Sequence, residues 1–342
     1  MKYVKLGNSG VKVSQLCLGT WHLPVLPELD EYGVHKVDKE LSLKLFKKAY
    51  DLGITFFDTA NRYAGSMQTA DLNHVGTSER ILGEFLKSID RESIILATKV
   101  RGKMGPWPHG EGLSRKHIMW QIKESLKRLN TTYIDLYQIH WPDPDTPKLE
   151  TLRTLDSLVK QGLVYYIGES NHSAHDIVEF MELSERYNLE KFVSMQERYN
   201  IIDRRIEADK IPVAQRYGLA LLVYSPLHQG LLTAKYVDFQ NKTWKLPELS
   251  RASLFESVKN ELFNDRNLKI LLELNDIAKE KGITISQLAL AWLIKRQEEL
   301  NITIIPIIGV TSENQLLENI ESLNVNLSSD DMKRIEELTR QS

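Results

Sequence analysis

The sequence ITFFD at residues 54–58 is a short apolar run that ends on a carboxylate, Asp58. Two later runs share this design: IILATK ends on Lys99, and IDLYQIH ends on His140. Runs of this length and composition are typical of strands buried in a parallel sheet. Because the carboxyl ends of neighbouring parallel strands meet, we expect these three side chains, and Tyr63 just downstream, to lie close together.

Apolar runs and amphipathic segments alternate along the rest of the chain. The predicted strands are residues 16–20, 54–58, 94–99, 134–140, 164–169, 192–196, 220–224 and 303–306. The predicted helices are residues 40–51, 78–87, 115–129, 150–160, 174–187, 206–217, 267–281, 286–295, 313–323 and 330–339. This order favours an α/β fold, a (β/α)8 TIM barrel with an N-terminal β-hairpin over residues 4–13, long C-terminal-face loops and extra C-terminal helices.

An open, doubly wound sheet is the alternative architecture. A dinucleotide-binding open sheet normally carries G-x-G-x-x-G after an early strand, and this sequence has no such motif. We interpret the glycine-rich residues 101–112 instead as a mobile loop over the barrel mouth. Because no low-complexity linker or break in composition interrupts the chain, we expect a single domain over residues 1–342.

Charge and cysteine content exclude several classes of partner. The net charge of -2 offers no electrostatic basis for binding nucleic acid or an anionic membrane. The sequence shows neither a signal peptide nor a long apolar span, so we expect a cytoplasmic protein. Its one cysteine, Cys17, cannot form an internal disulfide and is expected in the core. The sequence leaves the oligomeric state open, and a homo-oligomer is compatible with it.

The four converging side chains suit proton donation to a carbonyl oxygen. A tyrosine with a pKa near ~10 is a weak acid at neutral pH, but an adjacent ammonium at Lys99 would lower the pKa of Tyr63 while Asp58 holds that ammonium. His140 would orient the carbonyl. Each residue also has a plainer interpretation, because Tyr63 could be a packing residue and Asp58 could cap a turn. Lys99 has the strongest case, since a lysine ending so apolar a strand needs a buried partner.

The motifs together resemble the aldo-keto reductase superfamily. They are FDTA followed by Tyr63, ATK at residues 97–99, DLYQIHW at residues 135–141, GESN at residues 168–171, and Gly309 followed by Q-x-x-E-N. A further motif, YSPL at residues 224–227, is similar to the branch that includes bacterial reductases and potassium-channel β subunits. The resemblance implies reduction of an aldehyde or ketone by direct hydride transfer from NADP(H). It also implies that Tyr63 is the general acid, with no metal required.

The resemblance further implies the binding residues. Residues expected at the cofactor are Thr20, Trp21, Asp58, Ser170, Asn171, Gln196, Tyr224, Ser225, Pro226, Leu227, Gln229, Gly230, Lys235, Arg251, Gly309, Thr311, Gln315, Glu318 and Asn319. Residues expected at a small carbonyl substrate are Trp21, Tyr63, Trp107, His140 and Trp141, with the loop at residues 64–76 forming one wall. Within the first set, Lys235 and Arg251 would reach phosphates, and Tyr224 would stack on the nicotinamide.

Two alternatives remain open at this stage. Many members of the superfamily carry a basic residue after the last glycine to hold the 2′-phosphate, whereas this chain has neutral Thr311 and Ser312. We favour NADP(H) because Arg251 can compensate, and NAD(H) is the alternative. The second function that we consider is a nucleotide-bound interaction subunit with little turnover. Retention of His140 favours the enzyme.

Overall fold

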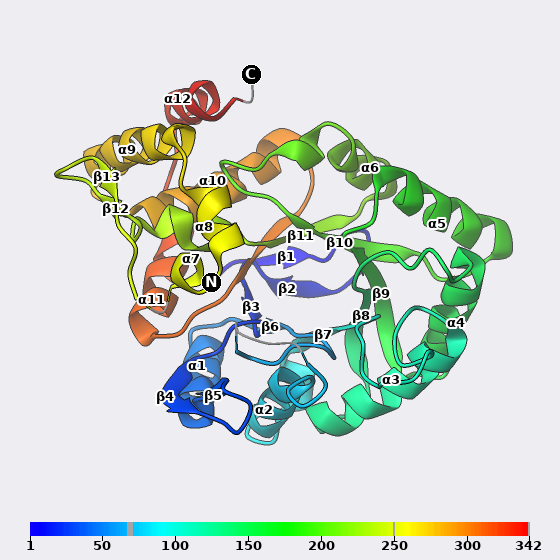
Figure 1. Ribbon diagram of the computed structural model, residues 1–342. Coiled ribbons are helices and arrows are strands. Elements are labelled where there is room, and N and C mark those ends of the chain that lie inside the picture. Colours follow the sequence, from blue (N-terminus) through cyan, green and yellow to red (C-terminus); the bar gives the residue numbers. More distant parts are fainter. Residues whose placement is uncertain (67–70, 249, 341–342) are drawn as a thin grey trace.

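The computed structural model describes residues 1–66, 71–248 and 250–340, and its centre is a closed barrel of parallel strands. In spatial order the barrel strands are β3 (Cys17–Gly19), β6 (Phe56–Asp58), β7 (Ile95–Val100), β8 (Ile134–Ile139), β9 (Val164–Ser170), β10 (Phe192–Arg198), β11 (Ala220–Tyr224) and β14 (Ile304–Ile308). The barrel closes where β14 pairs with β3. The predicted (β/α)8 architecture is therefore confirmed, and the open sheet is excluded (Figure 1).

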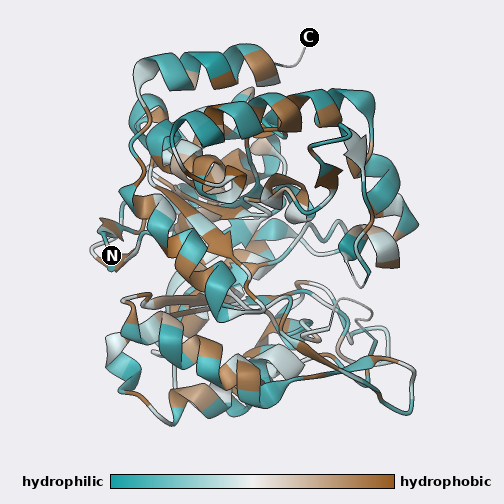
Figure 2. Cartoon of the chain, turned by 90° about the vertical axis from the view of Figure 1, so that its left-hand side faces the viewer, coloured by the Kyte–Doolittle hydropathy of each residue, from teal (hydrophilic) through white to brown (hydrophobic). Residues whose placement is uncertain are grey.

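Helices surround the barrel. They are α1 (Lys39–Asp51), α2 (Thr77–Leu86), α3 (Arg115–Leu129), α4 (Lys148–Lys160), α5 (Ala174–Tyr187), α6 (Lys210–Tyr217), α10 (Ile285–Leu300) and α11 (Glu313–Glu321), with α9 (Asp265–Glu280) and α12 (Ser329–Thr339) packed together outside them. Hydrophobic residues gather on the central strands and the inward helix faces, while the outer faces are hydrophilic (Figure 2). Among the described residues, no helix combines the length and apolarity needed to cross a membrane.

The interior of the barrel is sealed at its N-terminal end by the predicted hairpin, β1 (Tyr3–Lys5) and β2 (Lys12–Ser14). Leu6 and Val13 from this hairpin join the cluster of inward-facing strand residues, which also contains the buried, unpaired Cys17. Gly7 has φ +59, and a Cβ there would lie 2.2 Å from the Val193 carbonyl oxygen, so only glycine permits this close approach. The barrel is consequently open to a ligand at the opposite, C-terminal end.

The structure contains short elements that the hydrophobic pattern did not predict. They are a hairpin of β4 (Val25–Leu29) and β5 (His35–Val37), and in the seventh loop β12 (Val237–Asp238), β13 (Thr243–Trp244), α7 (Arg251–Leu254) and α8 (Glu256–Leu262). The helix predicted over residues 206–217 was wrong at its start. A separate 3-10 turn covers residues 205–207, and α6 begins only after Asp209, whose side chain accepts from the Lys210 amide. Proline in the first turn of a helix is compatible with this start.

Candidate active site

Four polar side chains meet at the carboxyl ends of β6, β7 and β8. The Lys99 ammonium, whose side chain is fully buried, lies 2.5 Å from a carboxylate oxygen of Asp58 and 3.0 Å from the hydroxyl oxygen of Tyr63. It also donates to the backbone carbonyl of Thr59 at 3.0 Å. The rings of Tyr63 and His140 pack edge to face, with centroids 5.6 Å apart. The sequence analysis expected polar residues at the carboxyl ends of neighbouring strands to lie close together, and we call this expectation the strand-end rule. The structure brings together the four residues to which the rule was applied.

Two glutamines complete the coordination of the Asp58 carboxylate. Its second oxygen accepts from the side-chain amides of Gln138 at 3.1 Å and Gln196 at 3.0 Å. Hydrogen bonds of this kind hold the carboxylate in a fixed orientation. Gln196 was expected to face the cofactor, but its amide is directed to Asp58 and Gln138. Sequence analysis missed Gln138 because it lies inside a buried strand, although a polar residue in so apolar a run was the available signal.

Proton positions in this cluster follow from a count of donors. A protonated lysine has three N–H groups and no acceptor, and Lys99 has three acceptors: Asp58, Thr59 and Tyr63. The Tyr63 oxygen therefore receives a proton from Lys99, and its own hydroxyl proton must point elsewhere.

Lys99 lowers the pKa of Tyr63, as expected, but burial has the larger effect and the net shift is upward. For Lys99, burial alone would lower the pKa, but Asp58 and Tyr63 together raise it above its usual value. Both groups are therefore fully protonated at neutral pH, and the neutral phenol lies next to a fixed positive charge.

His140 is uncharged at neutral pH. Burial, together with the positive charges of Lys99, Arg62 and Arg101, holds the pKa of its imidazole well below the usual value. Its Nδ1 atom is buried and has no hydrogen-bond partner within the described part of the chain. Because a buried polar atom without a partner is unfavourable, this orphan nitrogen is consistent with a site that is completed by a ligand.

A second buried histidine, His228, makes the stability of the fold sensitive to acid. Burial lowers the pKa of His228 to about 4 in the folded state, whereas the unfolded state has a pKa of about 6.5. Between these two pH values the ring is neutral in the folded state and protonated in the unfolded state. The sign is therefore that stability falls as pH falls through this window, by about 1.4 kcal/mol per pH unit for this ring.

A His228→Asn variant should flatten the pH dependence by about that amount, because asparagine does not titrate and tolerates the positive φ of 46° at this position. Urea unfolding at a series of pH values measures the slope. A slope equal to that of the wild type would show that His228 is protonated in the folded state as well.

The cluster opens into a cavity of about 1090 Å³. The predicted residues on its wall are Trp21, Asp58, Tyr63, His140, Trp141, Ser170, Asn171, Gln196, Tyr224, Ser225, Pro226, Leu227, Gln229, Gly230, Lys235, Arg251, Gly309, Thr311, Gln315, Glu318 and Asn319. Ala64 and Ser66 represent the loop that was expected to form one side. Sequence analysis missed Gly19, His22, Arg62, Arg198, Thr233, Ser250, Ser286, Ile307 and Ile308. Arg198 ends β10, so the strand-end rule could have predicted its position at the cavity.

Two predicted contact residues are not brought to the cavity. Thr20 is fully buried, and its hydroxyl donates to the Asp58 carbonyl at 3.2 Å. Trp107 is 44% exposed and packs against Trp120, with ring centroids 5.7 Å apart. It was assigned to the substrate on the assumption that its loop covers the barrel mouth. Within this loop the Met104 amide donates a hydrogen bond to the Gly110 carbonyl at 2.8 Å.

The loop at residues 64–76 divides between two cavities. Its residues 67–70, including Met67, lie outside the described residues. His74 faces a second, smaller cavity of about 410 Å³. There its imidazole nitrogens lie 2.6 Å from Asp30 and 2.7 Å from Asp71. His74 therefore contributes nothing to the wall of the larger cavity.

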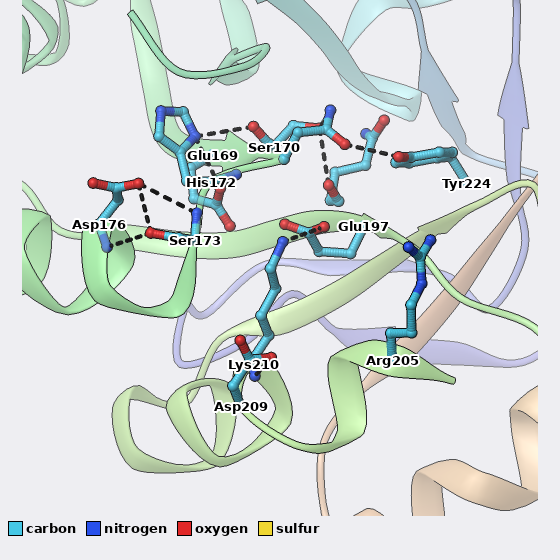
Figure 3. A network of polar contacts seen from close by, with 12 residues as sticks. Glu169, Ser170, His172, Ser173, Asp176, Glu197, Arg205, Asp209, Lys210 and Tyr224 are labelled. Atoms are coloured by element: carbon cyan, nitrogen blue, oxygen red, sulfur yellow. Dashed lines mark hydrogen bonds and ion pairs between the residues drawn. The ribbon is translucent and has the colours of Figure 1, made fainter. Parts of the chain in front are cut away.

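One side of the cavity presents amide and hydroxyl groups at the ends of β9, β10 and β11. The Tyr224 hydroxyl donates to the side-chain oxygen of Asn171 at 2.7 Å, and the Asn171 amide donates to the His140 carbonyl at 3.0 Å and to Ser170 at 2.9 Å. Below them Glu197 is paired with Lys210 at 2.7 Å (Figure 3). This network holds the Tyr224 ring and the Asn171 amide in fixed orientations.

Another part of the cavity wall is positively charged. Lys235 and Arg251 line it. Burial and, to a smaller extent, the neighbouring charge of Arg251 lower the pKa of Lys235. Burial also lowers the pKa of Arg251 to about 10. Within the described residues neither cation has a carboxylate partner. A Cβ at Gly230 would lie 2.9 Å from the Lys235 ammonium, so the glycine makes room for it. Two partly desolvated cations without carboxylate partners have the charge and the donors that suit an anionic ligand.

Comparison with known proteins agrees with this geometry. The aldo/keto reductase family model matches residues 15–340. The chain belongs to the aldo/keto reductase family. A "Probable voltage-gated potassium channel subunit beta" from Oryza sativa is 33% identical over 330 residues, which is 95% of this chain and 92% of the relative. An L-glyceraldehyde 3-phosphate reductase from Escherichia coli O157:H7 is 30% identical and matches 98% of this chain and 92% of its own length.

A third relative bears an aryl-alcohol dehydrogenase name. It comes from Schizosaccharomyces pombe, is 32% identical and matches 98% of this chain and 95% of its own length. This aldo/keto reductase family member thus has oxidoreductases among its relatives, alongside channel subunits. The resemblance inferred from the sequence motifs is confirmed at the level of the family.

Proposed function

We propose that this aldo/keto reductase is an NADP(H)-dependent enzyme that reduces aldehydes or ketones to alcohols. The observation that carries the proposal is the donor arrangement at Lys99, whose three N–H groups are all engaged, one of them by the Tyr63 oxygen. The hydroxyl proton of Tyr63 is thereby left for a carbonyl in the cavity. A general acid positioned in this way typically accelerates a reaction by about a hundredfold to ten-thousandfold.

The chain's own residues perform the binding and proton steps. A bound nicotinamide cofactor would supply the hydride. The neutral imidazole of His140 orients the carbonyl, and Tyr63 donates its proton to the carbonyl oxygen as negative charge develops there. The Lys99 ammonium, 3.0 Å from the Tyr63 oxygen, then stabilises the phenolate, and the Asp58 carboxylate keeps that ammonium charged and in place.

The two cations without a carboxylate partner among the described residues support NADP(H) as the cofactor. Nicotinamide would lie beside Ser170 and Asn171, against Tyr224, and the phosphates would lie at Lys235 and Arg251. The guanidinium of Arg251 stacks 4.5 Å from the ring of Trp21, which holds it over the cavity. We assign Arg251 to the 2′-phosphate, because Thr311 and Ser312 carry no charge and the Ser312 hydroxyl is used to cap α11.

Replacing Arg251 by methionine should therefore change cofactor selectivity. We expect the Kd for NADPH to rise about tenfold or more, because a charge-assisted contact is lost, and the Kd for NADH to change far less. Titration of the intrinsic protein fluorescence with each cofactor measures both constants. Equal weakening of both would assign Arg251 to the phosphates common to NADP and NAD.

A nucleotide-bound interaction subunit is the second candidate, and it is favoured by the relatives named as potassium-channel subunits. The two candidates differ in turnover. Protein loaded with NADPH should be mixed in a stopped-flow instrument with a panel of aldehydes and ketones, while the absorbance of the reduced cofactor is followed and the alcohol product is identified. The reductase proposal requires single-turnover oxidation with alcohol formed in equal amount. If NADPH binds but no carbonyl compound oxidises it, the reductase proposal is contradicted and the interaction subunit remains as the candidate function.

A further inference from the structure

Arg62 places an uncompensated positive charge in the cavity, next to the proposed proton donor. It immediately precedes Tyr63, is of intermediate exposure and lines the cavity wall. Within the described residues it makes no ion pair and no side-chain hydrogen bond. The assigned cofactor residues do not account for this charge.

The side chain of Arg62 is held in position by two neighbours. A Cβ at Gly102 would lie 2.7 Å from the Arg62 Cβ and 2.9 Å from its Cδ, so the stem of the arginine runs over a backbone that only glycine leaves free. Its guanidinium lies 5.9 Å from the ring of Trp141. A guanidinium held over an aromatic ring is ordered in advance and loses little freedom when it binds an anion.

A second arginine adds to this region but is already neutralised. The guanidinium of Arg101 lies 5.1 Å from the Trp141 ring on the same loop system, and it forms an ion pair with Glu111 at 3.2 Å. Lys99 is likewise balanced by Asp58. Among the described residues that line the cavity near Tyr63, Arg62 is thus the cation that has no carboxylate partner.

This cation is distinct from the pair assigned to the cofactor phosphates. Arg62 and Arg101 act on the imidazole of His140, whereas Lys235 and Arg251 act on that of His22. The cavity thus has one cationic region at its phosphate side and another beside Tyr63 and His140, where the carbonyl must lie. An anion bound at the second region belongs to the substrate.

We infer that Arg62 selects carbonyl substrates that carry an anionic substituent, a carboxylate or a phosphate, close to the carbonyl group. This inference rests on the proposed reductase function and names its substrate class. A guanidinium binds either anion through two parallel hydrogen bonds, and the interaction is stronger in a partly closed cavity than in open water. A guanidinium that only covered Trp141 would confer no such preference.

The test compares matched pairs of substrates. Carboxybenzaldehyde and its methyl ester differ in one carboxylate, and glyceraldehyde 3-phosphate and glyceraldehyde differ in one phosphate. For the wild type, Arg62→Gln and Arg62→Lys, we measure the ratio of kcat/KM for the anionic and the neutral member of each pair. Arg216→Gln is the control, since Arg216 is 67% exposed and pairs with Glu182.

We expect Arg62→Gln to lower the ratio roughly tenfold to a hundredfold, mainly through KM, for the anion that the site binds. Arg62→Lys should keep part of the preference, and Arg216→Gln all of it. Whichever pair responds identifies carboxylate or phosphate. Ratios unchanged in both pairs, in an enzyme that still turns over, would overturn the inference and leave the reductase function intact.

A binding measurement separates the two proposals further. Calorimetric titration of the protein with benzoate and with glycerol phosphate, in the presence of excess NADP+, does not depend on turnover. Binding that is lost in Arg62→Gln and kept in Arg216→Gln supports the anion site even if no aldehyde is reduced. Equal binding by Arg62→Gln and the wild type would contradict it.

Discussion

A Tyr63→Phe variant should lose about a hundredfold or more of kcat with any carbonyl substrate, because it removes the only proposed proton donor and little else. The ring, its edge contact with His140 and its position above Lys99 are all retained. The Kd for NADPH should therefore stay close to that of the wild type. Steady-state kinetics and a cofactor titration measure the two quantities.

The chain offers a matched control for this substitution. Tyr137 is fully buried in β8, and its hydroxyl has no hydrogen-bond partner within the described residues. Removing an unsatisfied buried hydroxyl leaves no unpaired partner behind, so Tyr137→Phe should keep full activity. A Tyr63→Phe enzyme as active as Tyr137→Phe would remove Tyr63 from the mechanism.

Lys99→Met is expected to have the largest effect on stability. The Asp58 carboxylate would lose its ammonium partner while remaining buried, and breaking a buried pair on one side typically costs about 3–5 kcal/mol. Urea unfolding followed by circular dichroism measures the change in the free energy of unfolding. We also expect turnover to be lost, since no charge would stabilise the Tyr63 phenolate.

A second substitution separates charge from packing. In the double variant Lys99→Met with Asp58→Asn, no buried charge is left without a partner, so part of the lost stability should return. Activity should not return, because the phenolate still lacks a cation. A Lys99→Met variant as stable as the wild type would show that the buried ion pair contributes nothing to stability.

The strand-end rule correctly grouped the residues of the proposed proton-donor site, because the order of strands and the residues at their ends can both be inferred from the sequence. Asp58, Lys99 and His140 each end an apolar run, and the carboxyl ends of parallel strands lie at the same end of a barrel. The net direction of the Tyr63 pKa could not be found in this way. It depends on the balance between burial and the charge of Lys99, and burial exists only in the folded chain.

The loops were the least predictable part of the site. Trp107 was placed at the substrate on the assumption that its loop covers the barrel mouth, but its ring packs against Trp120 and does not line the cavity. The charges of Lys235 and Arg251 were predicted at the cofactor only through family resemblance. Neither has a carboxylate partner in the part of the chain that the structure describes, and this observation, which supports phosphate binding, depends on the three-dimensional arrangement.

The most direct measurement of the central claim is isotopic tracing in a single turnover. Protein loaded with NADPH that is deuterated at the transferable position should be mixed with an aldehyde in ordinary water, and the alcohol should be analysed by mass spectrometry. Our account predicts one deuterium on the former carbonyl carbon, formed quickly by the wild type and about a hundredfold or more slowly by Tyr63→Phe. Alcohol without deuterium, or no alcohol from a protein that binds NADPH, would contradict carbonyl reduction at this site.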